Sequence, residues 1–343
     1  MNWRVAFLDE DHVLGVARDA LPRAGPAAEA RLRAFFAPEA FDHAALLACG
    51  SGLVLAPPEE AEVVLLRRAT VDAVLFERCP RLRLVQRLGE RRDHIDLGAA
   101  AARGVAVSCL PRPTLIRTAE HAILLMLALV KRLREAEGAV RQGTAAGAAG
   151  DVAYNWPGLG GLGGLHGLTL GIVGLGEVGA LVARRASAFG MRVLCTARHP
   201  PPAPLLADLG AEWRGLEMLL AESDIVSLHV SNLPENRGAM GEAELRLMRP
   251  GALLVNTSRG ALLDEAALVR ALREGRLGGA GLDVHAAEPR PAGDLLCALP
   301  NVVLTPHIAG GSRLGVLEEI EKMFANIRAV MAGLPPLHGR VLP

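Results

Sequence analysis

The chain has 343 residues, which is enough for two domains with substantial hydrophobic cores. Its formal net charge is +0 at pH 7, so no global field favours nucleic acid or an anionic membrane as a partner. The 5 cysteines are scattered without a CxxC pair, which argues against a metal site and a disulfide framework and favours a reduced, cytoplasmic protein.

The N-terminal part of the chain predicts neither a signal peptide nor a membrane span. Residues 1–15 carry acidic side chains where a signal peptide needs an apolar run. The longest strongly apolar run, residues 122–130, is too short to cross a bilayer. An apolar strand at residues 63–66 and an apolar segment at 73–76 indicate an α/β domain.

The pattern GxGxxG occurs twice, in residues 158–163 and again in residues 174–179. A loop that binds a dinucleotide pyrophosphate needs a buried strand before it and a helix after it. The first copy has neither, and we interpret residues Gly138 to Gly167 as a flexible connection or an exposed loop. The first copy is therefore not the expected binding loop.

The second copy has the required context, because residues 168–173 predict a strand, 180–189 a helix and 191–196 a second strand. Gly174 would allow the tight turn, Gly176 the approach of the backbone to the pyrophosphate, and Gly179 close helix–strand packing. The helix N-terminus adds amides and the positive end of a dipole. The predicted cofactor contacts in this loop are Gly174, Gly176, Glu177, Val178 and Gly179.

The end of the second strand bears on the choice of cofactor. An acidic residue there normally binds the ribose hydroxyls of NAD, but this chain has Ala197 followed by Arg198. A guanidinium can bind the 2′-phosphate of NADP in a bidentate manner. We expect NADP(H) to be favoured, with NAD(H) possible; the alternative is that Arg198 is a solvated surface arginine.

Strands and helices continue to alternate downstream, which predicts a parallel, doubly wound sheet. The predicted strands are residues 224–230, 252–257, 279–284 and 302–305, and the predicted helices are 242–247 and 264–274. Ligands bind such sheets at the carboxyl ends of the strands. Arg259, Glu288 and His307 each follow a strand end, so we expect them to share one cleft.

Hydride transfer to a 2-keto acid needs the functions that these side chains can supply. Arg259 could hold the carboxylate and polarise the carbonyl, and His307 could donate a proton near neutral pH. A carboxylate such as Glu288 orients an imidazole and favours its charged form. Taken alone, Arg259 could be part of a surface salt bridge, Glu288 an exposed loop residue and His307 a strand-end cap.

At this point four segments resemble the D-isomer-specific 2-hydroxyacid dehydrogenase family, which includes glyoxylate/hydroxypyruvate reductases and phosphoglycerate dehydrogenases. The segments are LTLGIVGLGEVG (168–179), VNTSRGALLD (255–264), GLDVHAAEP (281–289) and NVVLTPHIAG (301–310). They occur in the family's order and spacing, and the resemblance runs from about Leu82 to near the C-terminus.

The resemblance implies roles for individual residues. It makes Arg259, Glu288 and His307 catalytic, and it makes Asp283 a contact to the nicotinamide amide. Further cofactor contacts are expected at Val230 and Thr257.

The resemblance also implies a domain arrangement and an assembly. It implies a Rossmann-type doubly wound sheet, residues 118–311, inserted into a smaller flavodoxin-like α/β domain. That smaller substrate domain is formed by residues 1–117 and a returning helix in 312–343. Family members are usually homodimers joined largely through their cofactor domains.

The chain departs from the family in the segment expected to hold the substrate. The family has a Gly-x-Gly turn whose amides bind the substrate carboxylate, but this chain has Gly89, Glu90 and Arg91, which we predict as substrate contacts. If the turn were kept, Arg91 would add strain of about 1–2 kcal/mol. Where the family often has Pro-Gly-x-Asn, this chain has residues 111–114, PRPT.

Two interpretations of this altered loop remain open. One or two of its arginines could hold a second anionic group of the substrate, or the loop has drifted and the arginines are solvated. The arginines concerned are Arg87, Arg91, Arg92 and Arg112. His285 also stands where the family commonly has Phe, and we interpret it as a local packing variant.

Together these features predict an NAD(P)-dependent oxidoreductase that interconverts a small anionic 2-keto acid and a D-2-hydroxy acid. One alternative is a relative that acts on another small anion, such as formate or phosphite. Another is a dinucleotide-sensing binding protein with little turnover. The complete Arg, Glu and His set argues against this last alternative, and the altered substrate loop argues for it.

Overall fold

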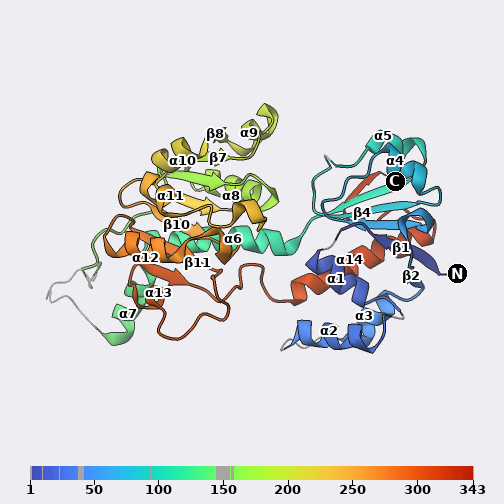
Figure 1. Cartoon of the computed structure of the whole chain (residues 1–343), viewed down its shortest axis with the longest axis horizontal. Helices are drawn as coiled ribbons and strands as arrows, with labels where there is room; N and C mark the ends of the chain where they lie inside the picture. The colour runs from blue at the N-terminus through green and yellow to red at the C-terminus, as the bar shows by residue number, and fades with distance from the viewer. Residues whose placement is uncertain are drawn as a thin grey trace. The chain divides into compact units, whose positions relative to one another are not determined.

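The computed structural model describes residues 2–9, 11–22, 24–37, 42–92, 94–143, 155 and 158–342. The chain forms two compact units (Figure 1). The first, which we call the split unit, consists of Met1–Thr114 and Gly311–Pro343. The second, the inserted unit, consists of Leu115–Gly310.

The split unit contains a six-stranded sheet in the order β13-β5-β4-β3-β1-β2. All neighbouring strands are parallel except β13, which runs antiparallel to β5. The strands are β1 (Trp3–Phe7), β2 (Leu53–Leu55), β3 (Val63–Leu66), β4 (Leu84–Leu88), β5 (Ala106–Leu110) and β13 (Arg340–Leu342). The parallel part has the strand order 2-1-3-4-5 of flavodoxin-like sheets, as the sequence predicts.

Strand β3 explains why this sheet is covered on both faces. Its four residues are all fully buried, and successive side chains point to opposite faces. Val63 and Leu65 belong to the core formed with α1, α2, α3 and α14, whereas Val64 and Leu66 belong to the core formed with α4 and α5. The helices are α1 (His12–Asp19), α2 (Pro26–Phe36), α3 (His43–Cys49), α4 (Ala73–Arg78), α5 (Leu97–Ala102) and α14 (Leu314–Met331).

The inserted unit contains a seven-stranded, fully parallel sheet in the order β12-β11-β10-β9-β6-β7-β8. The strands are β6 (Thr169–Val173), β7 (Arg192–Thr196), β8 (Ala211–Trp213), β9 (Ile225–Leu228), β10 (Leu253–Asn256), β11 (Gly279–Leu282) and β12 (Val302–Leu304). The chain winds outward from β6 in both directions. This confirms the predicted Rossmann-type, doubly wound sheet.

Helices cover both faces of the seven-stranded sheet. One core joins the strands to α6 and α8, and the other joins them to α10, α11 and α12. The helices of this part of the chain are α6 (Pro113–Val130), α7 (Leu133–Gln142), α8 (Glu177–Ala188), α9 (Ala203–Leu209), α10 (Leu216–Glu222), α11 (Glu242–Leu247), α12 (Glu265–Arg273) and α13 (Leu295–Ala298).

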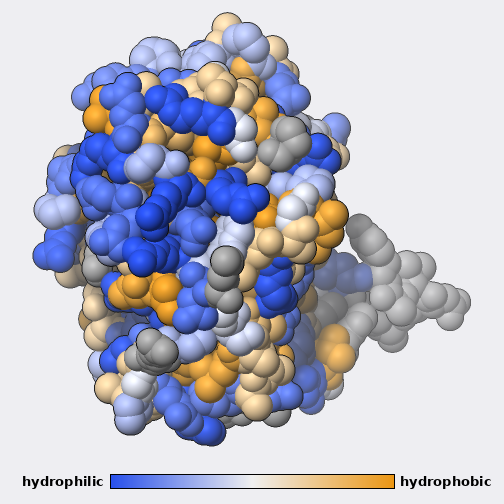
Figure 2. All heavy atoms as spheres, turned by 90° about the vertical axis from the view of Figure 1, so that its right-hand side faces the viewer, coloured by the Kyte–Doolittle hydropathy of each residue, from blue (hydrophilic) through white to orange (hydrophobic). Residues whose placement is uncertain are grey.

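Helix α6 is long and apolar enough, by length and composition alone, to cross a membrane. The length of the apolar run 122–130 alone does not indicate this, because the helix begins nine residues before the run, at Pro113. Its Ala119, Ala122 and Met126 are fully buried in a core of the inserted unit, so α6 packs as a core helix. The face drawn in Figure 2 mixes hydrophilic and hydrophobic residues and is mostly hydrophilic.

The prediction that residues 138–167 form a connection or exposed loop is wrong at its start. Helix α7 continues to Gln142 and ends at Gly143, which has a left-handed φ of 63°. An ion pair between Arg141 and Glu137 lies within this helix, none of whose residues is buried. Residues 144–154 and 156–157 of the expected connection lie outside the described residues.

A buried ion pair holds the returning helix α14 in the split unit. The Glu319 carboxylate accepts a hydrogen bond from Arg112 Nε at 3.0 Å, and both side chains are almost fully buried. Its other oxygen accepts hydrogen bonds from the Thr114 amide at 3.3 Å and the Thr114 hydroxyl at 2.5 Å. One carboxylate therefore links α14 to the segment that follows β5.

We expect Glu319→Ala to lower the free energy of unfolding by about 3–5 kcal/mol, because it leaves the Arg112 charge buried without compensation. Lys322→Ala is the matched control on the same helix. It removes only the part-exposed pair with Glu318, worth about 0.3–0.5 kcal/mol. Guanidinium unfolding of both variants measures the difference. Equal losses would show that the buried pair contributes little.

Candidate functional site

The second glycine pattern forms the turn between β6 and α8, and its glycines differ in what surrounds them. Gly174 has a φ of +102°, and a Cβ there would lie 2.8 Å from the His229 carbonyl carbon. A Cβ on Gly179 would overlap the Gly174 carbonyl oxygen. A Cβ on Gly176 would meet nothing within 4 Å. The fold requires the first and third glycines, whereas the second faces open space that a ligand could enter.

Helix α8 begins at Glu177, directly after Gly176, which makes no side-chain capping bond. The amides of its first turn and the positive end of the helix dipole suit an anion at this place. Val178 lies in the same turn. Glu177 Oε1 is buried and has no hydrogen-bond partner among the described residues.

Two further buried polar atoms at the carboxyl edge of the sheet lack partners within the described part of the chain: Thr257 Oγ1 and His229 Nδ1. Thr257 follows β10, and His229 follows β9 and precedes the half-buried Val230. Burial lowers the pKa of His229 to about 4, so its imidazole is neutral. Buried polar atoms are normally hydrogen-bonded, so these positions fit a bound polar molecule such as a dinucleotide.

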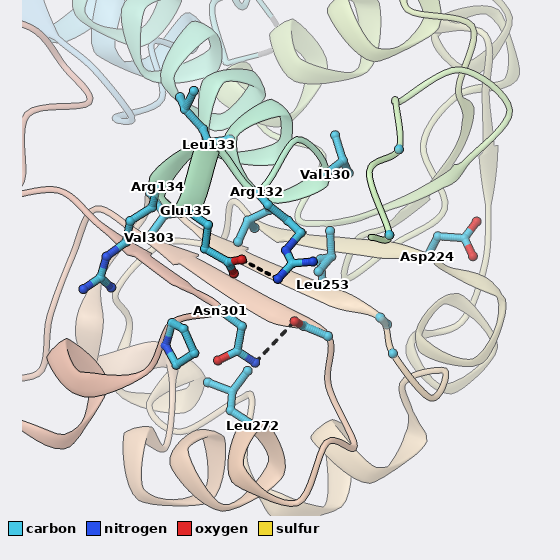
Figure 3. Close-up of a pocket in the computed structure, with 18 of the residues that line it drawn as sticks. Val130, Arg132, Leu133, Arg134, Glu135, Asp224, Leu253, Leu272, Asn301 and Val303 are labelled. Atoms are coloured by element: carbon cyan, nitrogen blue, oxygen red, sulfur yellow. Dashed lines mark hydrogen bonds and ion pairs between the residues drawn. The ribbon is translucent and has the colours of Figure 1, made fainter. Parts of the chain in front are cut away.

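The first glycine pattern lies near the amino ends of the strands of the same sheet, opposite their carboxyl ends. Gly161, Gly163 and Gly164 line a cavity of about 900 Å³. The cavity is also lined by residues that precede or begin strands β9, β10 and β12, namely Asp224, Leu253 and Asn301 (Figure 3). The cavity is therefore at the amino ends of the strands, away from the carboxyl ends where the predicted site residues lie.

Arg198 lies two residues beyond β7 and is exposed. Its Nη2 donates to Glu235 Oε1 at 3.1 Å, in the short 3₁₀ helix Pro234–Asn236. Both side chains are more than half exposed, so this pair contributes little to stability and can be broken by a ligand.

Glu288 and His307 are joined directly, by a hydrogen bond of 2.8 Å between Oε2 and Nδ1. Partial burial raises the pKa of Glu288. The hydrogen bonds from His307 and from the His285 amide outweigh that effect, so its pKa is below the ordinary value. The carboxylate is thus charged at neutral pH. The imidazole remains 45% exposed in this arrangement.

Asp283 is fully buried at the end of β11, and its carboxylate organises the segment that carries His307. One oxygen accepts from the Thr305 hydroxyl at 2.6 Å and the Ile308 amide at 2.9 Å. The other accepts from the Ala309 amide at 2.8 Å. His307 has a left-handed φ of 55° between these anchors. The expected contact of Asp283 with the nicotinamide amide stays a prediction.

Arg259 lies in a turn that Asn256 constructs. The fully buried Asn256 side chain donates to the Arg259 carbonyl at 2.9 Å and accepts from the Ser258 amide at 3.0 Å. The Arg259 side chain is exposed, and its guanidinium donates to the Ser258 carbonyl at 2.6 Å. A Cβ on the next residue, Gly260, would overlap the backbone of His285, so the loops after β10 and β11 touch.

The altered substrate loop follows β4 in the split unit. Gly89 keeps a positive φ of +114°, but Arg91 is not left-handed, so the strain expected for Arg91 is absent. Arg87 is buried and donates to the carbonyls of Arg67 and Arg91. Arg112 is also buried, so the interpretation of these arginines as solvated is wrong for both. Glu90, Arg91 and Arg92 are exposed, and their contact with substrate stays a prediction.

Sequence reasoning missed several residues of this region. Asn256 could have been found as a polar residue at a strand end before a turn. The His121 contact had no local signal, because α6 brings its Nε2 to within 2.9 Å of Thr305 Oγ1 only through tertiary packing. His229 directly follows β9 and lies in none of the four family segments, whereas Thr305 directly follows β12 and lies within the segment 301–310.

The fold and the β6–α8 turn define a dinucleotide-binding α/β protein. Residues 123–309 match the family model described as the D-isomer specific 2-hydroxyacid dehydrogenase, NAD binding domain. The chain is 42% identical over 269 residues to a glyoxylate reductase of Korarchaeum cryptofilum, covering 78% of each chain. It is 40% identical over 290 residues to a glyoxylate reductase of Thermococcus litoralis, covering 83% of this chain and 85% of that one.

A crystal structure of a glyoxylate reductase from Paecilomyes thermophila is similar with a TM-score of 0.57 and 30% identity, covering 99% of this chain and 98% of that one. The chain therefore belongs to the D-isomer-specific 2-hydroxyacid dehydrogenase family. Its cofactor is a nicotinamide dinucleotide.

We expect Gly176→Val to abolish dinucleotide binding, because the new side chain would occupy the space that the pyrophosphate needs. Gly160→Val is the matched control from the first glycine pattern. A Cβ at either position meets nothing within 4 Å among the described residues, so the two glycines have similar space for the first atom of a side chain. Calorimetric titration with dinucleotide measures both. Equal losses of affinity would contradict the assignment of the second pattern.

Proposed function

We propose that this chain interconverts a small 2-keto acid and the corresponding D-2-hydroxy acid, with NADP(H) as the favoured cofactor and His307 as the proton donor in reduction. The hydrogen bond between Glu288 Oε2 and His307 Nδ1 carries the proposal. It fixes one nitrogen of an exposed imidazole and leaves Nε2 without a partner among the described residues. That nitrogen can give a proton to a substrate oxygen.

The remaining roles follow from charge and position. The bound nicotinamide supplies the hydride. The charged Glu288 carboxylate holds Nδ1 of the His307 imidazole, so Nε2 is the nitrogen that faces the substrate oxygen. The exposed guanidinium of Arg259 binds the substrate carboxylate and polarises the carbonyl. In the split unit, the loop of Gly89, Glu90 and Arg91 supplies further contacts to the substrate.

The names of the similar proteins support a small keto acid as substrate, since the three reported above are glyoxylate reductases. We further propose that the split unit binds the substrate, with bounds near 1–117 and 312–343. The inserted unit, near 118–311, would bind the cofactor. The homodimer and the cytoplasmic location stay predictions.

The function is tested by NADPH oxidation with a panel of keto acids. Glyoxylate and hydroxypyruvate represent substrates with one anionic group, and oxaloacetate and phosphohydroxypyruvate represent those with two. A higher kcat/KM for the second pair would support an anion-binding role for Arg91 or Arg92. Failure to turn over any of them, with the dinucleotide still bound, would favour the dinucleotide-sensing alternative that the altered loop suggests.

We expect His307→Asn to lower kcat by about 10²–10⁴-fold while leaving dinucleotide affinity unchanged, because general acid catalysis contributes about that much. Asn is chosen because it tolerates the left-handed backbone of residue 307 better than Ala does. His166→Asn, an exposed histidine of the same unit, is the control. A fully active His307→Asn enzyme would remove His307 from the mechanism.

We expect Arg198→Ala to weaken NADPH binding by on the order of tenfold, because it removes a charge-assisted hydrogen bond to the 2′-phosphate. NADH affinity should hardly change. Glu235→Gln, which frees the guanidinium from its present partner, should shift the preference further toward NADPH. Fluorescence titrations with both dinucleotides measure the effect. A wild-type preference for NADH would show that Arg198 is only a surface arginine.

A further inference from the structure

His285 lies where three loops of the candidate site meet. Its backbone packs directly against Gly260, in the loop that carries Arg259. Its amide donates to Glu288 Oε1 at 2.9 Å. Its imidazole Nε2 lies 2.9 Å from the carbonyl oxygen of Thr305, two residues before His307.

The tautomer of this imidazole is set by Arg290. The Arg290 guanidinium donates from Nε to His285 Nδ1 at 3.1 Å, so Nδ1 must be an acceptor. The remaining nitrogen, Nε2, then carries the hydrogen and donates to the Thr305 carbonyl.

Arg290 is itself held in place. Its side chain is 9% exposed and pairs with Glu265 at 2.5 Å and with Asp294 at 2.8 Å. Glu265 also accepts from the Ala286 amide at 2.9 Å, which ties the start of α12 to the loop after β11. The guanidinium therefore approaches His285 from a fixed direction.

We propose that His285 is a positioning residue for the reaction, acting through the hydrogen bond from its Nε2 to the Thr305 carbonyl to hold His307 against Glu288. The inference rests on the proposed function only where it concerns turnover. The His285 amide fixes the Glu288 carboxylate, and the imidazole fixes the segment that carries His307. The two partners of the Glu288–His307 hydrogen bond are thus anchored to the same residue. A packing variant would need no such hydrogen bonds.

Two substitutions separate the two nitrogens of the ring. In His285→Gln, the longer side chain can still donate an N–H to the Thr305 carbonyl. In His285→Asn, the amide reaches the Arg290 side but not Thr305. Both variants remove the ring and keep a polar amide in its place, so they differ mainly in the bond that the proposal requires.

We expect kcat for keto-acid reduction to fall by about 10–100-fold in His285→Asn, because a misplacement of about 1 Å can cost up to about 10²-fold. KM and dinucleotide affinity should change little, and His285→Gln should retain most of the wild-type kcat. If both variants match the wild type, or if both lose activity equally, the proposed role of Nε2 is wrong.

A second measurement does not depend on turnover. In protein labelled with ¹⁵N-histidine, the His307 Nδ1 proton shared with Glu288 gives a signal that is assigned by its loss in His307→Asn. We expect this signal in the wild type and in His285→Gln, and its loss or broadening in His285→Asn. An unchanged signal in His285→Asn would overturn the proposal.

The two measurements distinguish the failure of this inference from the failure of the proposed function. If the wild type reduces no keto acid, the proposed function fails and the ¹⁵N spectrum alone decides the role of His285. If His285→Asn does not fold, Arg290→Lys replaces it, because an ammonium cannot reach His285, Glu265 and Asp294 at once. Wild-type kcat and an unchanged His307 signal in Arg290→Lys would then contradict the inference.

Discussion

The candidate site depends on the buried carboxylate of Asp283. A charge without exposure to water must be compensated by hydrogen bonds, and three donors from the segment after β12 supply them. A left-handed backbone at His307 costs about 1–2 kcal/mol. Each hydrogen bond to a charged group contributes about 1.5–3 kcal/mol. The three hydrogen bonds to Asp283 therefore contribute more free energy than the backbone strain at His307 costs. The hydrogen bonds of Asp283 therefore fix the conformation of the segment that holds His307.

The space around each glycine also distinguishes the glycines that the fold requires from those that leave room for a ligand. Gly174, Gly179 and Gly260 are needed because other backbone atoms occupy the volume a side chain would fill. Gly176 has open space beside it, which leaves room for a ligand to approach the backbone. The glycines of one motif are thus subject to different physical constraints.

Much of the inserted unit was predictable because its strands alternate with helices and end in recognisable motifs. Helix α11 has the predicted bounds, and Asp264 caps α12 as a residue just outside it. The split unit was harder, since short strands such as β2 and β13 have no local pattern of their own. Arg87 and Arg112 were considered as possible surface residues. Arg87 binds backbone carbonyls, which leave no signal in the sequence. Arg112 binds Glu319, which lies far away in the sequence. The contacts of His285 were likewise not predictable, because they come from separate loops.

The split unit also has a consequence for synthesis of the chain on the ribosome. Its core includes Ile320, Met323, Phe324 and Ile327 of α14, which are made only after the whole inserted unit. At about 5–20 residues per second, translation of that unit takes roughly 10–40 s. During this interval one face of the sheet formed by β1 to β5 has α1, α2 and α3 but lacks α14. The part of this apolar face that packs on α14 therefore stays uncovered until α14 leaves the exit tunnel.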